Sequence, residues 1–121
     1  GLLGVSEMSQ DMRTLLASAD ARAKEAVDLF VHRIARETGA LAASLGGLDG
    51  FVFAGGIGEH AAPVRAAVAE RLGWLGARLD RDANAHGVGR IDAPGSHVAL
   101  WVIPTDEEAM IAMHAREVVD G

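Results

Sequence analysis

Apolar side chains recur every three or four residues between positions 21 and 45, which is the spacing of one face of a helix. The sequence therefore predicts one long amphipathic helix over this range. Gly39 lies inside it and is interpreted as a point of close packing, because glycine weakens a helix unless a neighbour comes near. The expected buried stripe consists of Val27, Phe30, Val31, Ile34, Thr38, Leu41 and Leu45.

Two short apolar runs have the length and composition of strands. Residues 51–54 read Phe-Val-Phe-Ala without polar alternation, which is typical of a strand buried on both faces. Residues 97–103 form a second strand that stops at Pro104. The first run leads into Gly-Gly-Ile-Gly-Glu at 55–59, interpreted either as a glycine turn that brings backbone N–H groups to a ligand or as a tight turn without one.

The remaining pattern adds helices around these strands. A helix is expected to begin near Pro63, with a buried stripe formed by Val64, Val68, Leu72 and Leu75. Residues 77–103 predict a small hairpin-like excursion, and residues 9–16 a short helix. Thr105 and Glu108 have the spacing of a capping box, which predicts that a last helix begins there. Helix, glycine turn and strand in succession indicate an α/β fold.

Composition narrows the classes of function. The 121 residues, half of them hydrophobic, suffice for one compact domain. A net charge of -6 argues against nucleic-acid binding, because no basic stripe is present to neutralise phosphates. No apolar run has the roughly 18 residues of a membrane span, so no membrane partner is expected. The chain contains no cysteine, which fits a cytoplasmic protein.

The ends of the two strands suggest a chemistry. If the strands are parallel neighbours, their carboxyl ends meet in one crevice, where ligands of open α/β sheets usually lie. One end carries the glycines and the other is followed by Asp106, Glu107 and Glu108. Backbone N–H groups can hold phosphate oxygens there, and a nearby carboxylate can hold Mg²⁺. This combination is the one that phosphoryl transfer requires.

Six short segments, in one order, carry a family resemblance. They lie at residues 1–6, 9–13, 32–34, 48–59, 64–65 and 103–108. Together they closely resemble the carboxyl-terminal part of acetate kinases, in the family of acetate and propionate kinases. The resemblance implies that residues 1–121 are a carboxyl-terminal nucleotide-binding subdomain, with the amino-terminal catalytic half absent.

The resemblance implies a partial ribonuclease-H-like fold, as in the superfamily of actin, sugar kinases and heat-shock ATPases. It also implies reversible transfer of the ATP γ-phosphoryl group to acetate, giving acetyl phosphate and ADP, with Mg²⁺ as cofactor and a homodimer as the assembly. No catalytic residue is expected in this segment, and Glu107 is the expected metal ligand. The nucleotide-binding residues carried over from the family are Asp11, Met12, Arg13, Gly56, Ile57, Gly58, Glu59 and His60.

Two residues depart from the family pattern. His60 and Asp106 stand where the family usually has asparagines. A histidine cannot offer the forked hydrogen bonding of an amide, so contacts to adenine or ribose at position 60 change. We expect the 121 residues alone to have no acetate kinase turnover. A noncatalytic nucleotide-binding or dimerisation module, or a segment of a propionate kinase, is the alternative.

Overall fold

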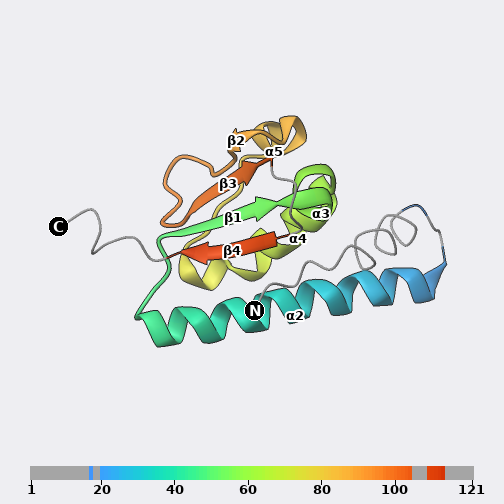
Figure 1. Ribbon diagram of the computed structural model, residues 1–121, viewed down its shortest axis with the longest axis horizontal. Helices are drawn as coiled ribbons and strands as arrows, with labels where there is room; N and C mark the ends of the chain where they lie inside the picture. The colour runs from blue at the N-terminus through green and yellow to red at the C-terminus, as the bar shows by residue number, and fades with distance from the viewer. Residues whose placement is uncertain (1–16, 18–19, 105–108, 114–121) are drawn as a thin grey trace.

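The computed structural model describes residue 17, residues 20–104 and the backbone of residues 109–113. Figure 1 shows a four-stranded sheet with helices packed beside it. The strands are β1 (Gly50–Ala54), β2 (Gly89–Arg90), β3 (Ala99–Ile103) and β4 (Ala109–Met113), in the order β2-β3-β1-β4. The helices are α2 (Ala21–Leu45), α3 (Gly55–His60), α4 (Ala62–Arg71), the 3₁₀ turn η1 (Gly73–Leu75) and α5 (Arg81–His86).

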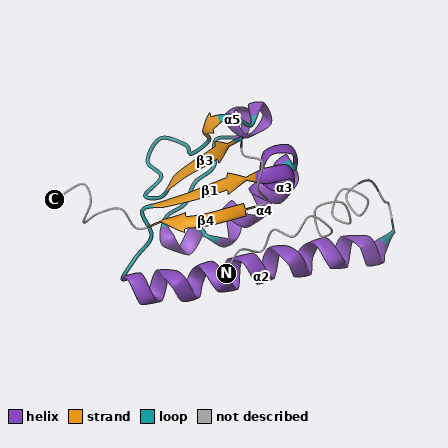
Figure 2. Cartoon of the chain, in the orientation of Figure 1, coloured by secondary structure: helices purple, strands orange, loops and turns teal. Residues whose placement is uncertain are grey.

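Helix α2 has the bounds that the sequence predicts. The Asp20 side chain accepts a hydrogen bond from the Arg22 N–H at 2.9 Å and caps the first turn, and Gly46 ends the helix at φ 80°. The helix packs against α4 and extends past the sheet at its amino-terminal end (Figure 2). The predicted stripe is wrong at its far end, because Leu41 and Leu45 are exposed and Ala42 is buried.

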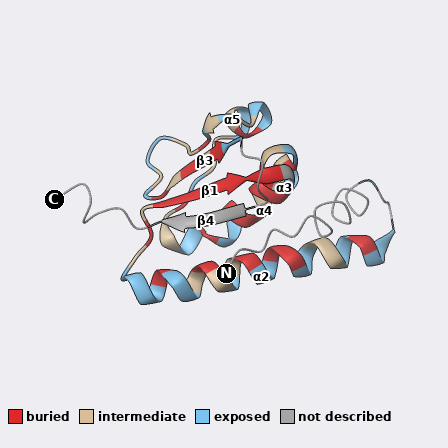
Figure 3. Ribbon diagram, in the orientation of Figure 1, coloured by how far each residue is buried: buried red, intermediate tan, exposed pale blue. Residues whose placement is uncertain are grey.

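The parallel pairing of β1 with β3 confirms that these strands are neighbours. Phe51 and Phe53 face the same side of the sheet as Leu100 and Val102, because these residues lie opposite one another in the register. On that side they join Ile34 and other α2 residues, together with α4 residues, in the main core. Val52 and Ala54 form a second cluster with Trp101 on the opposite face. Figure 3 shows β1 buried along its whole length, as its sequence predicts.

The prediction of a last helix near the end of the chain is wrong. The last helix, expected from Thr105 onward, is instead strand β4 at residues 109–113, antiparallel to β1; residues 105–108 lie outside the described residues. A sheet edge offers unpaired N–H and C=O groups, and pairing with this apolar segment satisfies them. The expected excursion at 77–103 holds helix α5 as well as the short strand β2.

Residues 55–60 form helix α3 directly after β1, which corrects the predicted glycine turn. Among residues 55–60, only Gly55 has a positive φ, 74°, a conformation that glycine adopts without steric cost where the chain passes from β1 into the helix. A Cβ at Gly58 would lie 2.8 Å from the carbonyl carbon of Phe53. Glycine at position 58 thus allows α3 to fold back against the backbone of β1.

Gly39, in the carboxyl-terminal half of α2, faces the side chain of Trp74 at an ordinary contact distance. A Cβ at this position would lie 3.4 Å from Cζ2 of Trp74 in η1. The neighbour is an indole ring, and most of that ring's residue is exposed. Gly39 therefore lies at the contact between α2 and the η1 turn that follows α4.

Candidate functional site

The candidate site lies where β1, β3 and β4 meet. Ala54, the last residue of β1, pairs with Ile103 at the end of β3 and with Ala109 at the start of β4. Helix α3 follows Ala54 directly and contacts both β3 and β4. The carboxyl ends of two parallel strands and a glycine-containing helix thus share one end of the sheet, as in the ligand-binding crevices of open α/β sheets.

The predicted nucleotide-binding residues fall into two groups. Gly56, Ile57, Gly58, Glu59 and His60 all lie in α3, where Gly58 is buried and His60 is exposed. Asp11, Met12 and Arg13 lie outside the described residues, and so does the predicted metal ligand Glu107. The structure therefore places the carboxyl end of β3 beside α3. It does not test where Asp11, Met12, Arg13 and Glu107 lie.

Next to α3 lies a buried arginine at position 65, which the sequence analysis included in the family resemblance but to which it gave no role. Arg65 in α4 is 2% exposed, and its guanidinium donates to the carbonyl oxygens of Gly58 and Glu59, both at 2.8 Å. These carbonyls belong to the last turn of α3, where the helix dipole is negative. Arg65 thereby fixes the carboxyl-terminal end of the segment that the family resemblance places against the nucleotide.

The other side of the same guanidinium holds α5. Arg65 Nε donates to Asn84 Oδ1 and Nη2 donates to the Asn84 carbonyl oxygen, each at 2.7 Å. The Asn84 amide in turn donates to the carbonyl oxygen of Ala62 at 3.1 Å. One side chain therefore joins α3, α4 and α5.

The charge of Arg65 has no carboxylate partner among the described residues, because its hydrogen-bond acceptors are carbonyl and amide oxygens. Burial lowers the pKa of Arg65 because desolvation disfavours the charged form. Arginine nevertheless stays protonated in proteins, so the guanidinium is a buried cation.

Gly87, at the end of α5, leaves room for this guanidinium. A Cβ there would lie 3.0 Å from Nη2 of Arg65, and Gly87 also has a positive φ of 67°. A sequence signal for Arg65 did exist: it adjoins Val64 in a helix of mostly small and apolar residues. That signal did not indicate which residues Arg65 contacts, because its neighbours Asn84 and Gly87 are distant in sequence.

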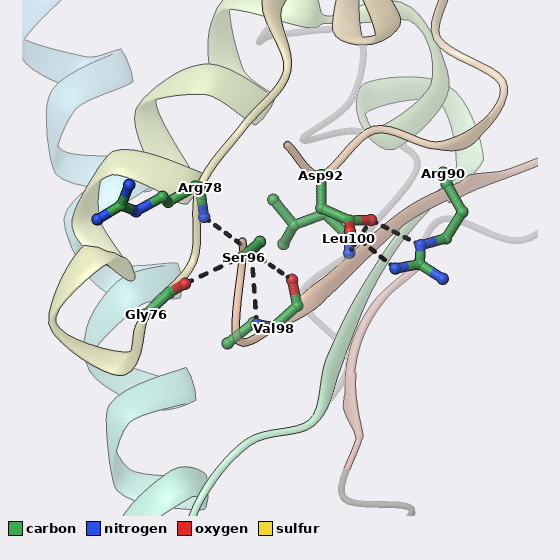
Figure 4. A network of polar contacts seen from close by, with 7 residues as sticks. All are labelled: Gly76, Arg78, Arg90, Asp92, Ser96, Val98 and Leu100. Atoms are coloured by element: carbon green, nitrogen blue, oxygen red, sulfur yellow. Dashed lines mark hydrogen bonds and ion pairs between the residues drawn. The ribbon is translucent and has the colours of Figure 1, made fainter. Parts of the chain in front are cut away.

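A second polar network lies near the amino end of β3 (Figure 4). Ser96 Oγ accepts from the Arg78 N–H at 2.9 Å and donates to the Val98 carbonyl oxygen at 2.7 Å. Asp92 accepts the Leu100 N–H at 3.1 Å, which holds the loop before β3 to the strand itself.

Asp92 also forms an ion pair with Arg90, whose Nε lies 2.6 Å from Oδ1 and whose Nη2 lies 2.7 Å from Oδ2. Hydrogen bonding from Arg90 lowers the pKa of Asp92, and the same bond raises the pKa of Arg90. The guanidinium carbon lies 5.0 Å from the centre of the Trp101 ring. This network stabilises a loop at the opposite end of β3 from α3.

Within the described residues, no three histidine, aspartate or glutamate side chains come together in a group that could hold a metal ion. Of the described helices, none combines the length and the apolar character that crossing a membrane requires.

The fold is that of acetate and propionate kinases. An acetate kinase structure from Entamoeba histolytica matches 88% of this chain with a TM-score of 0.73 and 34% identity, over 30% of its own length. A propionate kinase structure from Francisella tularensis subsp. tularensis SCHU S4 matches 80% of this chain with a TM-score of 0.70 and 34% identity, over 25% of its length. The predicted α/β fold class is thereby confirmed.

The sequence comparisons define the family. The model of the acetokinase family matches residues 1–113, and the chain belongs to this family. An acetate kinase of Rhodopseudomonas palustris (strain TIE-1) is 63% identical over 123 residues, which are 100% of this chain and 31% of the relative. The chain thus spans about a third of the length of the relatives it matches.

Proposed function

We propose that this chain is the carboxyl-terminal nucleotide-binding segment of an acetate kinase. The whole enzyme would transfer the γ-phosphoryl group of ATP reversibly to acetate, giving acetyl phosphate and ADP. The observation that carries the proposal is membership of the acetokinase family, with a 63% identical acetate kinase that matches the whole chain. The shared end of β1 and β3, with α3 beside it, supports a ligand site in the place that the proposal needs.

In this proposal the segment binds and orients ATP or ADP. Residues 56–60 in α3 and Asp11, Met12 and Arg13 lie against the adenosine half, and Glu107 holds Mg²⁺ directly or through water. Mg²⁺ neutralises phosphate charge during phosphoryl transfer. A carboxylate oxygen suits this hard cation, and substrate phosphates and water commonly complete its coordination, so a cluster of protein ligands is not required.

The family's catalytic groups are expected outside these 121 residues, so the chain alone should give no turnover. Positioning and electrostatic stabilisation provide most of the rate in phosphoryl transfer, and a nucleotide-binding segment alone supplies neither for the acyl acceptor. Propionate is a second candidate acceptor, because a propionate kinase structure is as similar in sequence to this chain as an acetate kinase structure is.

The test transfers these 121 residues into a full-length acetate kinase. The chain replaces the matching segment of the Rhodopseudomonas palustris enzyme, and acetyl phosphate formation from ATP and acetate is measured, with propionate as a competing acceptor. We expect this chimera to be active and the 121 residues alone to be inactive. Glu107→Ala should raise the Mg²⁺ concentration needed for half-maximal rate about tenfold, because one ligand of the hard cation is lost.

Glu70→Ala, at an exposed position on α4, serves as the control and should leave the Mg²⁺ requirement unchanged. A folded chimera that binds MgATP but makes no acyl phosphate would favour the noncatalytic module. Turnover by the 121 residues alone, at a rate near that of the intact relative, would refute the assignment of the catalytic groups to another part of the enzyme.

A further inference from the structure

We propose that Arg65 is a positioning residue for the nucleotide: it touches no ligand, but it holds the end of α3 in the conformation that binds ATP. The inference rests on the proposed function and adds to it a residue with a defined role. Its starting point is the burial of a cation whose described hydrogen-bond partners are all uncharged.

Stability alone gives a poor account of this arginine. Burying a charge costs free energy, which the hydrogen bonds of the guanidinium must first offset. Val64, Val68 and Leu72, from α4 and its carboxyl end, already supply the apolar contacts of this region. What the guanidinium adds is directional: it donates in fixed directions to several acceptors at once, which an apolar side chain cannot do.

Those directions converge on the segment proposed to bind the nucleotide. Two donated hydrogen bonds orient the peptide groups of Gly58 and Glu59, immediately before the exposed His60. From the other side Asn84 receives two hydrogen bonds and so fixes the guanidinium plane. Displacing that plane would move the peptide groups of α3, and an error of about 1 Å in a binding group is enough to weaken a preorganised site.

The packing around the guanidinium leaves little freedom for a different arrangement. Gly58 lies against the backbone of Phe53, so α3 cannot move toward β1. Gly87 closes the opposite side, where even a methyl group would lie 3.0 Å from Nη2. Arg65 therefore sits between two backbone segments at close range, and its length and planarity set their separation.

Arg65→Lys tests this role, because it keeps the positive charge and removes the planar fork of donors. In the active chimera we expect KM for ATP to rise about tenfold, with KM for acetate within about twofold of the unsubstituted value. Arg71→Lys is the matched control on the same helix: Arg71 is exposed, contacts His32, and should leave both constants unchanged. All assays are run well below the melting temperature of each variant.

Asn84→Ala provides a second variant in case Arg65→Lys does not fold. It removes one acceptor from the guanidinium but leaves the Asn84 carbonyl oxygen, and it should raise KM for ATP about threefold. A lower melting temperature with an unchanged KM for ATP, in either variant, would show that Arg65 is structural only and would overturn this inference. An inactive unsubstituted chimera would instead refute the proposed function.

Discussion

Two arginines of the chain bind their partners in opposite ways. In β2, opposite Trp101 of β3, Arg90 has a side chain that is 54% exposed and binds the carboxylate of Asp92 through two hydrogen bonds. In α4, Arg65 is 2% exposed and binds uncharged oxygens from two other helices, α3 and α5. An exposed ion pair contributes little free energy, whereas a buried cation that loses its acceptors, or leaves them unpaired, costs much more. The contrast shows that residue type alone does not indicate how much an arginine matters.

Arg65→Met should give the largest effect on stability. Methionine fills the volume but leaves the carbonyl oxygens of Gly58, Glu59 and Asn84 without their donor, so the free energy of unfolding should fall by about 3 kcal/mol. Urea denaturation measures this change. Arg71→Met, which affects an exposed side chain of the same helix, should change it by less than about 0.5 kcal/mol. Similar losses of unfolding free energy in the two variants would mean that the buried arginine matters no more for stability than the exposed one.

Gly87→Ala sharpens the comparison by crowding Arg65 without removing it. Gly87 and Gly89 both have positive φ values, 67° and 75°, so alanine is strained at either position. Only at Gly87 would the new methyl group lie against the guanidinium, because nothing lies within 4 Å of a Cβ at Gly89. Gly87→Ala should therefore cost about 1 kcal/mol more than Gly89→Ala in the same denaturation assay. An equal loss of stability in Gly87→Ala and Gly89→Ala would mean that the guanidinium moves away from the new methyl group without a cost in free energy.

Asp92→Asn should have the smallest effect at neutral pH, below about 1 kcal/mol, because it weakens an ion pair whose arginine is half-exposed to solvent. The pKa of Asp92 is lowered in the folded protein, so its contribution is fully present above its unfolded pKa of about 3.9 and is lost as the pH falls through the folded value. The stability difference between the unsubstituted chain and Asp92→Asn should therefore shrink in acid. Arg90→Gln should reduce the same dependence, and an unchanged acid profile in both variants would contradict this account.

Local patterns predicted the parts of the fold that local interactions determine. The 3.6-residue periodicity of α2 extends over its whole length, and glycine follows it at Gly46, so the helix was predicted with its observed bounds. Two apolar runs of strand length predicted β1 and β3 themselves, whereas their parallel pairing entered the sequence analysis only as a condition for the site. The errors are tertiary in origin: β4 is a strand because the edge of β1 is available to it.

The candidate site was less predictable than the fold. The residues of α3 were selected through their resemblance to a family, but their helical conformation depends on how closely Gly58 approaches Phe53. Arg65 was missed because its partners Asn84 and Gly87 are brought to it only by α5. Asp11, Met12, Arg13 and Glu107 stay predictions, since they lie outside the described residues.

The central position of β1 has a consequence for how the chain folds. The partners of Gly50 are Ala99 on one side and Met113 on the other, both far along the chain. Contacts between residues so distant in sequence carry a loop-closure cost and slow the folding of small domains. On a ribosome, β1 would emerge long before either partner, and its apolar side chains would meanwhile depend on α2 or on a chaperone for cover.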